Sequence, residues 1–162
     1  RIGVLATPST VKSNAYTKAI LGFNPKAFVL EQPCPEFVSN IELNDINLDK
    51  LRTLANEYLT PLLKAEVESI ILGCSHYPLI IPLLSELIPS KVNLIDPAVA
   101  LSFKLESFLG EKIIDPTNRG SLTNSKFYVT SDPNKFAIRS KNWLNICPEF
   151  VLVSLWNKAC VS

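Results

Sequence analysis

Residues 69–80 read Ser-Ile-Ile-Leu-Gly-Cys-Ser-His-Tyr-Pro-Leu-Ile, and this stretch decides the expected fold. The short apolar run before Cys74 predicts a strand that is buried on both faces. Pro78 predicts the start of a helix. The N–H group of a first helical residue has no partner within the helix, so proline loses no hydrogen bond there. A strand followed directly by a helix is typical of α/β proteins, whose ligands bind beyond the carboxyl ends of the strands.

Cys74 and the only histidine, His76, lie two residues apart at this junction. In extended backbone this spacing places both side chains on the same side. A helix N-terminus and a nearby imidazole both favour thiolate over thiol, so the pattern indicates a reactive cysteine. The alternative is an inert cysteine buried at the end of an apolar strand, which is the ordinary state of a buried cysteine.

The composition fits one ordinary domain or two small lobes. Of the 162 residues, 47% are hydrophobic, which is ample for a core. The net charge of +1 gives no charge-driven attraction to nucleic acid, and no apolar run has the length of a membrane span. The cysteines show no C-x-x-C pair and lack the histidines of a zinc site, although their even number leaves one disulfide open: Cys34, Cys74, Cys147 and Cys160. A reduced, cytoplasmic protein is therefore expected.

Apolar runs alternate with helix signals along the chain. Strands are predicted at residues 2–6, 27–30, 69–73, 92–95 and 127–130, with a last apolar run at 150–156. Helices are predicted from Thr10 to Gly22, from Asn47 with Pro61 near the end, over 78–87, from Asp96 to Gly110 and from Asp132. In the second of these, apolar residues at spacings of three and four predict the inward face: Leu48, Leu51, Ala55, Tyr58, Leu59 and Leu62. Residues 35–42 receive no assignment, and residues 113–123 are predicted to be rich in turns. This order predicts an α/β fold with a mainly parallel sheet flanked by helices.

Polar groups at other junctions are candidates for binding. Thr7 and Thr10 follow the first strand, and hydroxyl and N–H groups at a helix start bind carboxylates or phosphates. The simpler interpretation is that they cap the helix. Glu42 lies in a loop, where an exposed charge is the ordinary outcome. Asp96 and Asp132 are interpreted as caps.

Three segments together resemble glutamate racemase, a family of the aspartate/glutamate racemase superfamily. Residues 72–80 are similar to that family's motif Leu-Gly-Cys-Thr-His-Tyr-Pro-Leu. Residues 2–16 resemble its segment of two threonines, a serine and a tyrosine at the same spacing. Residues 34–42 resemble its Cys-Pro-x-Phe-Val segment with a following glutamate. The resemblance covers nearly the whole chain in order.

The resemblance implies racemisation of glutamate without a cofactor or metal, by two cysteines on opposite faces of the substrate, which supplies D-glutamate for peptidoglycan. It makes Cys74 the second cysteine, which takes the α-proton from L-glutamate and returns it to that face. His76 would polarise Cys74, and Glu42 would support His76. The residues that would bind the substrate's carboxylate or amino groups are Thr7, Thr10 and Ser75. Ser75 stands where most members have threonine.

The family's amino-terminal motifs, Asp-Ser, Pro-Tyr-Gly and the first catalytic cysteine in Cys-Asn-Thr, do not occur in this sequence. The carboxyl-terminal portion of a racemase is therefore expected, with residues 1–95 as a complete α/β lobe and 96–162 as a segment that completes a second lobe. The 162 residues alone are expected to be inactive. The implied partners are glutamate, the missing amino-terminal segment and a second copy in a homodimer.

Two other functions stay open. The first is an aspartate-type racemase, although that sister group typically has glutamate where His76 stands. The second is a non-catalytic fragment that binds an amino acid or a protein partner, which the absent first cysteine favours. Neither nucleic acid nor a membrane is expected as a partner.

Overall fold

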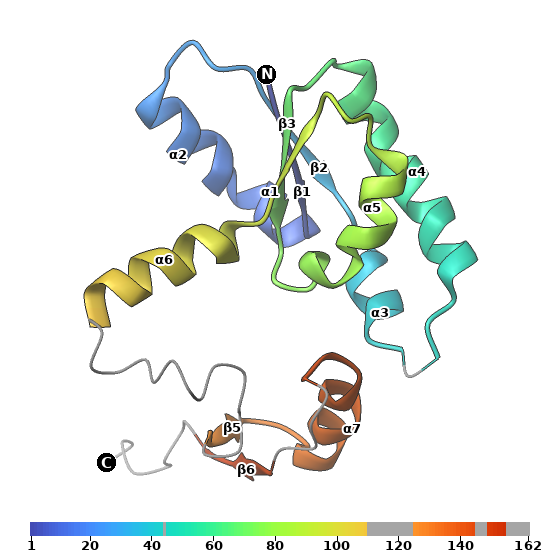
Figure 1. Ribbon diagram of the computed structural model, residues 1–162, viewed down its shortest axis with the longest axis vertical. Helices are drawn as coiled ribbons and strands as arrows, with labels where there is room; N and C mark the ends of the chain where they lie inside the picture. Colours follow the sequence, from blue (N-terminus) through green and yellow to red (C-terminus); the bar gives the residue numbers. More distant parts are fainter. Residues whose placement is uncertain (44, 110–124, 145–148, 155–162) are drawn as a thin grey trace, which may run out of the picture. The chain divides into compact units, whose positions relative to one another are not determined.

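The computed structural model describes residues 1–43, 45–109, 125–144 and 149–154 (Figure 1). The chain forms two compact units, residues 1–108 and 109–162. The predicted helix after Asp96 belongs mainly to the first unit. The assignment of residues 96–162 to a second racemase lobe stays a prediction.

A parallel sheet of four strands forms the centre of the first unit and confirms the predicted α/β class. The sheet order is β2-β1-β3-β4, with bounds Ile2–Ala6 (β1), Val29–Pro33 (β2), Ser69–Gly73 (β3) and Asn93–Ile95 (β4). In the register, Ala6 of β1 lies opposite both Pro33 of β2 and Gly73 of β3. The carboxyl ends of three strands therefore meet at one edge, and the residues that follow them are brought together there.

Helices flank this sheet, with α2 on one side and α4 and α5 on the other in Figure 1. Their bounds are Pro8–Ser13 (α1), Ala15–Phe23 (α2), Phe37–Ile41 (α3), Leu48–Lys64 (α4), Ile81–Leu87 (α5) and Pro97–Leu109 (α6). A 3₁₀ turn, η1 (Tyr77–Ile80), precedes α5. Among the described residues, no helix combines the length and apolar character that a membrane crossing needs.

The longest helix packs one apolar face against the sheet. The side chain of Asn47 accepts a hydrogen bond from the N–H of Lys50, which confirms the predicted cap. The predicted inward positions are buried at Leu51, Ala55, Tyr58, Leu59 and Leu62. The prediction that Leu48 also faces inward is wrong, because 63% of this residue is exposed. It is the first helical residue, and a helical side chain leans toward the preceding turn, which is absent here.

The predicted single helix from Thr10 to Gly22 is wrong. Thr7 is the cap, Pro8 occupies the first turn, and α1 ends at Ser13, followed by Asn14, whose φ of 52° is left-handed. A second helix, α2, starts directly afterwards and runs through Gly22. Asparagine tolerates the left-handed region because its short polar side chain bonds locally, so no glycine is needed for the break.

Four further elements differ from the sequence prediction. The second strand is shifted toward the carboxyl end, to residues 29–33, and the unassigned segment 35–42 contains α3. The helix after Cys74 begins as a 3₁₀ turn, and regular α-helix starts only at Ile81. The strand β3 is buried at Ile70 and Leu72 but only half-buried at its other positions, so burial on both faces is not complete.

The helix α6 starts as predicted but packs little. The N–H of Ala98 donates to Asp96 Oδ1 at 2.9 Å, which confirms the cap. None of the helix's side chains is buried, and the exposed fractions of Val99 and Phe103 are 54% and 67%. The predicted stop at Gly110 lies outside the described residues.

In the second unit, two parallel strands, β5 (Phe127–Val129) and β6 (Phe150–Leu152), accompany α7 (Pro133–Leu144). Asp132 Oδ1 accepts hydrogen bonds from the N–H groups of Asn134 and Lys135, which confirms the predicted cap. The rings of Phe127 and Phe136 lie 5.3 and 5.9 Å from the ring of Phe150. The predicted turn-rich segment 113–123 and the end of the last apolar run lie outside the described residues.

Candidate functional site

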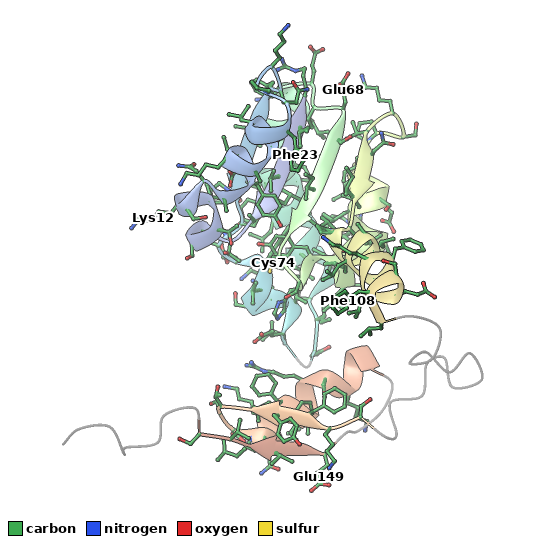
Figure 2. All side chains as sticks on the ribbon, turned by 90° about the vertical axis from the view of Figure 1, so that its left-hand side faces the viewer. Lys12, Phe23, Glu68, Cys74, Phe108 and Glu149 are labelled. Atoms are coloured by element: carbon green, nitrogen blue, oxygen red, sulfur yellow. The ribbon has the colours of Figure 1, made fainter. Side chains whose placement is uncertain are left out.

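The candidate site lies at the carboxyl edge of the sheet, where β1 and β3 end side by side. Thr7 follows directly after β1, and Cys74 follows directly after β3. Figure 2 shows Cys74 at this end of the strand. Cys74 is half-buried, so part of the residue is accessible from the surface of the unit.

Cys74, His76 and Glu42 form a chain of polar contacts. The sulfur of Cys74 lies 3.9 Å from Nδ1 of His76, and Nε2 of His76 lies 3.0 Å from Oε1 of Glu42. About a third of each side chain is exposed, with 33% for His76 and 30% for Glu42. The predicted link between these three residues is therefore present in the geometry, although their catalytic roles stay predictions.

The chain of contacts suits proton transfer at the thiol. An ionised carboxylate only accepts hydrogen bonds, so Glu42 favours the tautomer in which His76 Nε2 carries the proton. Nδ1 then has a free lone pair toward the sulfur of Cys74 and can accept the thiol proton. The resulting imidazolium lies beside the Glu42 carboxylate, which stabilises the charge. The arrangement is that of a cysteine activated by an oriented base.

Glu42 reaches His76 because aromatic packing joins α3 to η1. The ring of Phe37 makes edge-to-face contacts with Tyr58 and Tyr77, at centroid distances of 5.0 and 5.3 Å. The hydroxyl of Tyr77 donates to the carbonyl oxygen of Cys34 at 3.4 Å. The sequence did not predict α3 because a five-residue helix is too short to show a helical period.

Thr7 and Thr10 bond to each other. Their hydroxyl oxygens lie 2.9 Å apart, and the N–H of Thr10 donates to the hydroxyl of Thr7 at 3.3 Å. The interpretation of this junction as a helix cap is confirmed, with Thr7 as the capping residue. Both side chains are half-buried, and binding of substrate by them stays a prediction.

A pocket of about 480 Å³ opens beside the thiol. Its lining includes Cys74 and the exposed Ser75 from the predicted set. Tyr16 and Asp96 also line the pocket, although the sequence predicted a role in binding for neither residue. Tyr16 lies in residues 2–16, which carry the family resemblance, and this resemblance was the signal in the sequence that could have identified it as a site residue. The interpretation of Asp96 as a cap holds, and the same residue also lines the pocket.

Cys34 differs sharply from Cys74. Only 1% of Cys34 is exposed, and its thiol donates to the carbonyl oxygen of Gln32 at 3.5 Å. Burial raises the pKa of the Cys34 thiol to about 12, so it stays protonated at physiological pH. Cys34 is therefore a structural residue. Cys147 and Cys160 lie outside the described residues.

Among the described residues, no three His, Cys, Asp or Glu side chains gather in a group that could hold a metal ion.

Residues 1–102 match the sequence profile of the family described as Asp/Glu/Hydantoin racemase. The chain belongs to this family. The match includes both strand-to-helix junctions of the candidate site.

Curated relatives are similar over all or nearly all of the chain. A glutamate racemase of Prochlorococcus marinus (strain NATL2A) is 56% identical over 162 residues, which is 100% of this chain and 61% of the relative. A glutamate racemase of Synechococcus sp. (strain CC9605) is 47% identical over 154 residues, or 94% of this chain and 58% of the relative. The chain thus spans about three fifths of the relatives' length.

Solved structures of glutamate racemases share the fold. The enzyme of Francisella tularensis, in complex with D-glutamate, superposes with a TM-score of 0.79 at 36% identity, covering 95% of this chain and 57% of the other. An isoform from Bacillus anthracis gives the same TM-score of 0.79 at 25% identity, with the same coverage.

Proposed function

We propose that this chain takes part in the interconversion of L- and D-glutamate, with Cys74 as one of two acid/base groups. The observation that carries the proposal is the Cys74–His76–Glu42 chain of contacts beside the pocket. The similarity to glutamate racemases, one of them solved with D-glutamate, supports glutamate as the substrate.

Cys74 takes the α-proton from L-glutamate in this proposal. Cys74 is half-buried at the end of the central strand β3, so a rigid element positions it while a substrate can still reach it. Loss of the α-proton leaves a planar carbanion, and a proton delivered to its opposite face gives D-glutamate. In the reverse direction the Cys74 thiol returns its proton to the carbanion.

His76 and Glu42 set the protonation state of Cys74. Transfer of the thiol proton to Nδ1 of His76 makes the thiolate that acts as base, and Glu42 stabilises the imidazolium. His76 also favours glutamate over aspartate as substrate, because aspartate-type racemases typically have glutamate at that position. Thr7, Thr10 and Ser75 are proposed to bind the carboxylate or amino groups of the substrate.

The second acid/base group must act on the other face of the α-carbon, since one thiol returns a proton only to the side from which it came. Cys34 is unsuited because it is buried and its pKa is raised to about 12. We propose that the group is the family's first catalytic cysteine, from the part of a racemase that these 162 residues do not match. A cytoplasmic homodimer that supplies D-glutamate for peptidoglycan is the accompanying biological proposal.

A chimera tests the function. In this racemase chimera, the 162 residues replace the segment that they match in the Prochlorococcus marinus (strain NATL2A) racemase. Circular dichroism of L-glutamate over time, with deuterium incorporation at the α-carbon followed by NMR, should show racemisation. The 162 residues alone should give at most trace exchange with retained configuration, because the second base is absent.

Three controls make the result decisive. Cys74→Ser in the chimera should abolish racemisation, and the unmodified relative sets the reference rate. L-aspartate should react far more slowly than L-glutamate. A chimera that folds but leaves glutamate unchanged, or that racemises aspartate faster, would contradict the proposal. Full racemisation by the 162 residues alone would mean that Cys34, Cys147 or Cys160 is the second base, and would contradict the assignment of that role to the family's first cysteine.

A further inference from the structure

Tyr16 lies against the backbone that carries Cys74, although the proposed proton transfer does not use it. A β-carbon added to Gly73 would lie 3.0 Å from Cε2 of Tyr16 and 2.9 Å from the carbonyl oxygen of Leu5. The tyrosine ring therefore occupies the space that a side chain at position 73 would need. The same residue lines the pocket beside Cys74.

The break between α1 and α2 determines where Tyr16 lies. Asn14 has left-handed dihedral angles, so Tyr16 belongs to the first turn of a new helix and does not continue α1. Ser13 braces the break, because its hydroxyl donates to the carbonyl oxygen of Thr10 at 2.6 Å and accepts from the N–H of Ala15 at 3.2 Å. The start of α2 is thus tied to the end of α1.

A carboxylate holds the same turn from the side of the sheet. Oε1 of Glu31, in β2, accepts hydrogen bonds from the N–H and the hydroxyl of Thr17 at 2.9 and 2.6 Å. Oε2 of Glu31 is buried and has no hydrogen-bond partner among the described residues. A carboxylate near a helix N-terminus is stabilised by the helix dipole. Glu31 therefore fastens the first turn of α2, and with it Tyr16, to the sheet.

The phenol of Tyr16 is uncharged at physiological pH. Burial raises its pKa, and negative charge at Cys74 and Glu31 raises it further. A neutral ring can pack closely on the backbone beside a thiolate without adding a second negative charge.

We propose that Tyr16 is a positioning residue for Cys74, whose ring fixes the end of β3 and thereby the place of the thiol. The inference rests on the proposed racemase function. A misplacement of a reacting group by about 1 Å can lower a rate by about a hundredfold. Loss of the ring should therefore reduce kcat, while KM changes little, because the substrate-binding groups stay in place.

The experiment compares three variants of the racemase chimera. Tyr16→Leu should lower kcat for L-glutamate by roughly 10- to 100-fold, with KM within about threefold of the parent. Tyr16→Phe keeps the ring and should retain kcat within about threefold. Tyr128→Leu is the matched control, since Tyr128 is 59% exposed in the second unit and should be silent.

Alkylation of the two described cysteines gives an independent readout, measured peptide by peptide with mass spectrometry. In Tyr16→Leu, Cys74 should react several-fold faster than in the parent, while the buried Cys34 stays protected. A rise at Cys74 alone shows local displacement with the fold intact.

Four results would overturn the inference: an unchanged kcat in Tyr16→Leu, an equal loss in Tyr16→Phe, an equal loss in Tyr128→Leu, or loss of protection at Cys34. The second result would mean that the hydroxyl acts on the substrate, and the last that the substitution disrupts the core. An inactive parent chimera would contradict the proposed function itself, so the two failures are distinguishable.

Discussion

Cys34 and Cys74 follow two parallel strands at the same edge of one sheet, yet their surroundings are opposite. Cys34, after β2, is buried in the core, and its carbonyl oxygen accepts a hydrogen bond from the hydroxyl of Tyr77. Cys74, after β3, is half-buried beside a pocket, with an imidazole 3.9 Å from its sulfur. Position in the fold therefore does not decide the chemistry of a cysteine. Its reactivity depends on how deeply it is buried and on the charged groups beside it.

The reaction rates of the two thiols should show the largest contrast. In the racemase chimera at neutral pH, Cys74 should alkylate at least about a hundredfold faster than Cys34, because thiolate fraction and access both favour it. Iodoacetamide labelling, quantified peptide by peptide, measures the ratio. Denatured protein is the control, in which the ratio should fall to near one. Equal rates in the folded protein would return Cys74 to the class of inert structural cysteines.

Removal of the imidazole should weaken the contrast at Cys74 only. His76→Ala should slow its alkylation by roughly tenfold, because the acceptor of the thiol proton is lost. Glu42→Gln should have a smaller effect of about two- to fivefold, since the amide oxygen still accepts from Nε2 but carries no charge. Labelling of Cys34 serves as the internal control. A His76→Ala protein with unchanged Cys74 reactivity would show that the imidazole does not activate the thiol.

The buried thiol should contribute to stability in a defined pH range. Its folded pKa of about 12 lies above its ordinary value of 9.0, so its contribution is fully present below pH 9 and is lost as the pH rises through 12. In that range the unfolded chain releases the proton while the folded chain retains it. As the pH rises through this range, the Cys34 thiol should therefore lower the free energy of unfolding by about 1 kcal/mol per pH unit.

Cys34→Ala tests that pH dependence by removing the thiol. Urea denaturation of the chimera at pH 8, 9 and 10 should show a shallower decline for the variant than for the parent. The variant should also be less stable at pH 8, because it leaves a small cavity. Parallel declines with pH would show that the Cys34 thiol ionises as easily in the folded protein as in the unfolded chain.

The smallest expected effect concerns the contact that covers Cys34. Tyr77→Phe removes the hydroxyl that donates to the Cys34 carbonyl oxygen but keeps the ring beside Phe37. The free energy of unfolding should fall by about 1 kcal/mol, the usual contribution of one hydrogen bond. Urea denaturation measures it, with Tyr128→Phe as the exposed control. No change, or a gain in stability, would mean that the 3.4 Å contact contributes nothing.

Local signals in the sequence determined many of the helices and strands in both units. The apolar runs at residues 2–6 and 69–73 are β1 and β3, and Asn47, Asp96 and Asp132 cap the predicted helices. These features depend on neighbours within four residues, so a single sequence carries them. The approach of Cys74 and His76 follows from a different backbone than the extended one predicted, because β3 ends at Gly73 and His76 has helical dihedral angles, so a turn brings the two side chains together.

Tertiary structure decided the rest. Glu42 meets a histidine 34 residues away because α3 packs on η1 through Phe37 and Tyr77. The break at Asn14, which places Tyr16 on Gly73, replaced a helix that looked continuous in sequence. Cys34 and Cys74 could not be told apart by their strand-end positions alone. Contacts between distant segments, and the burial that results from them, set these features, because packing free energy outweighs local preference once a core forms.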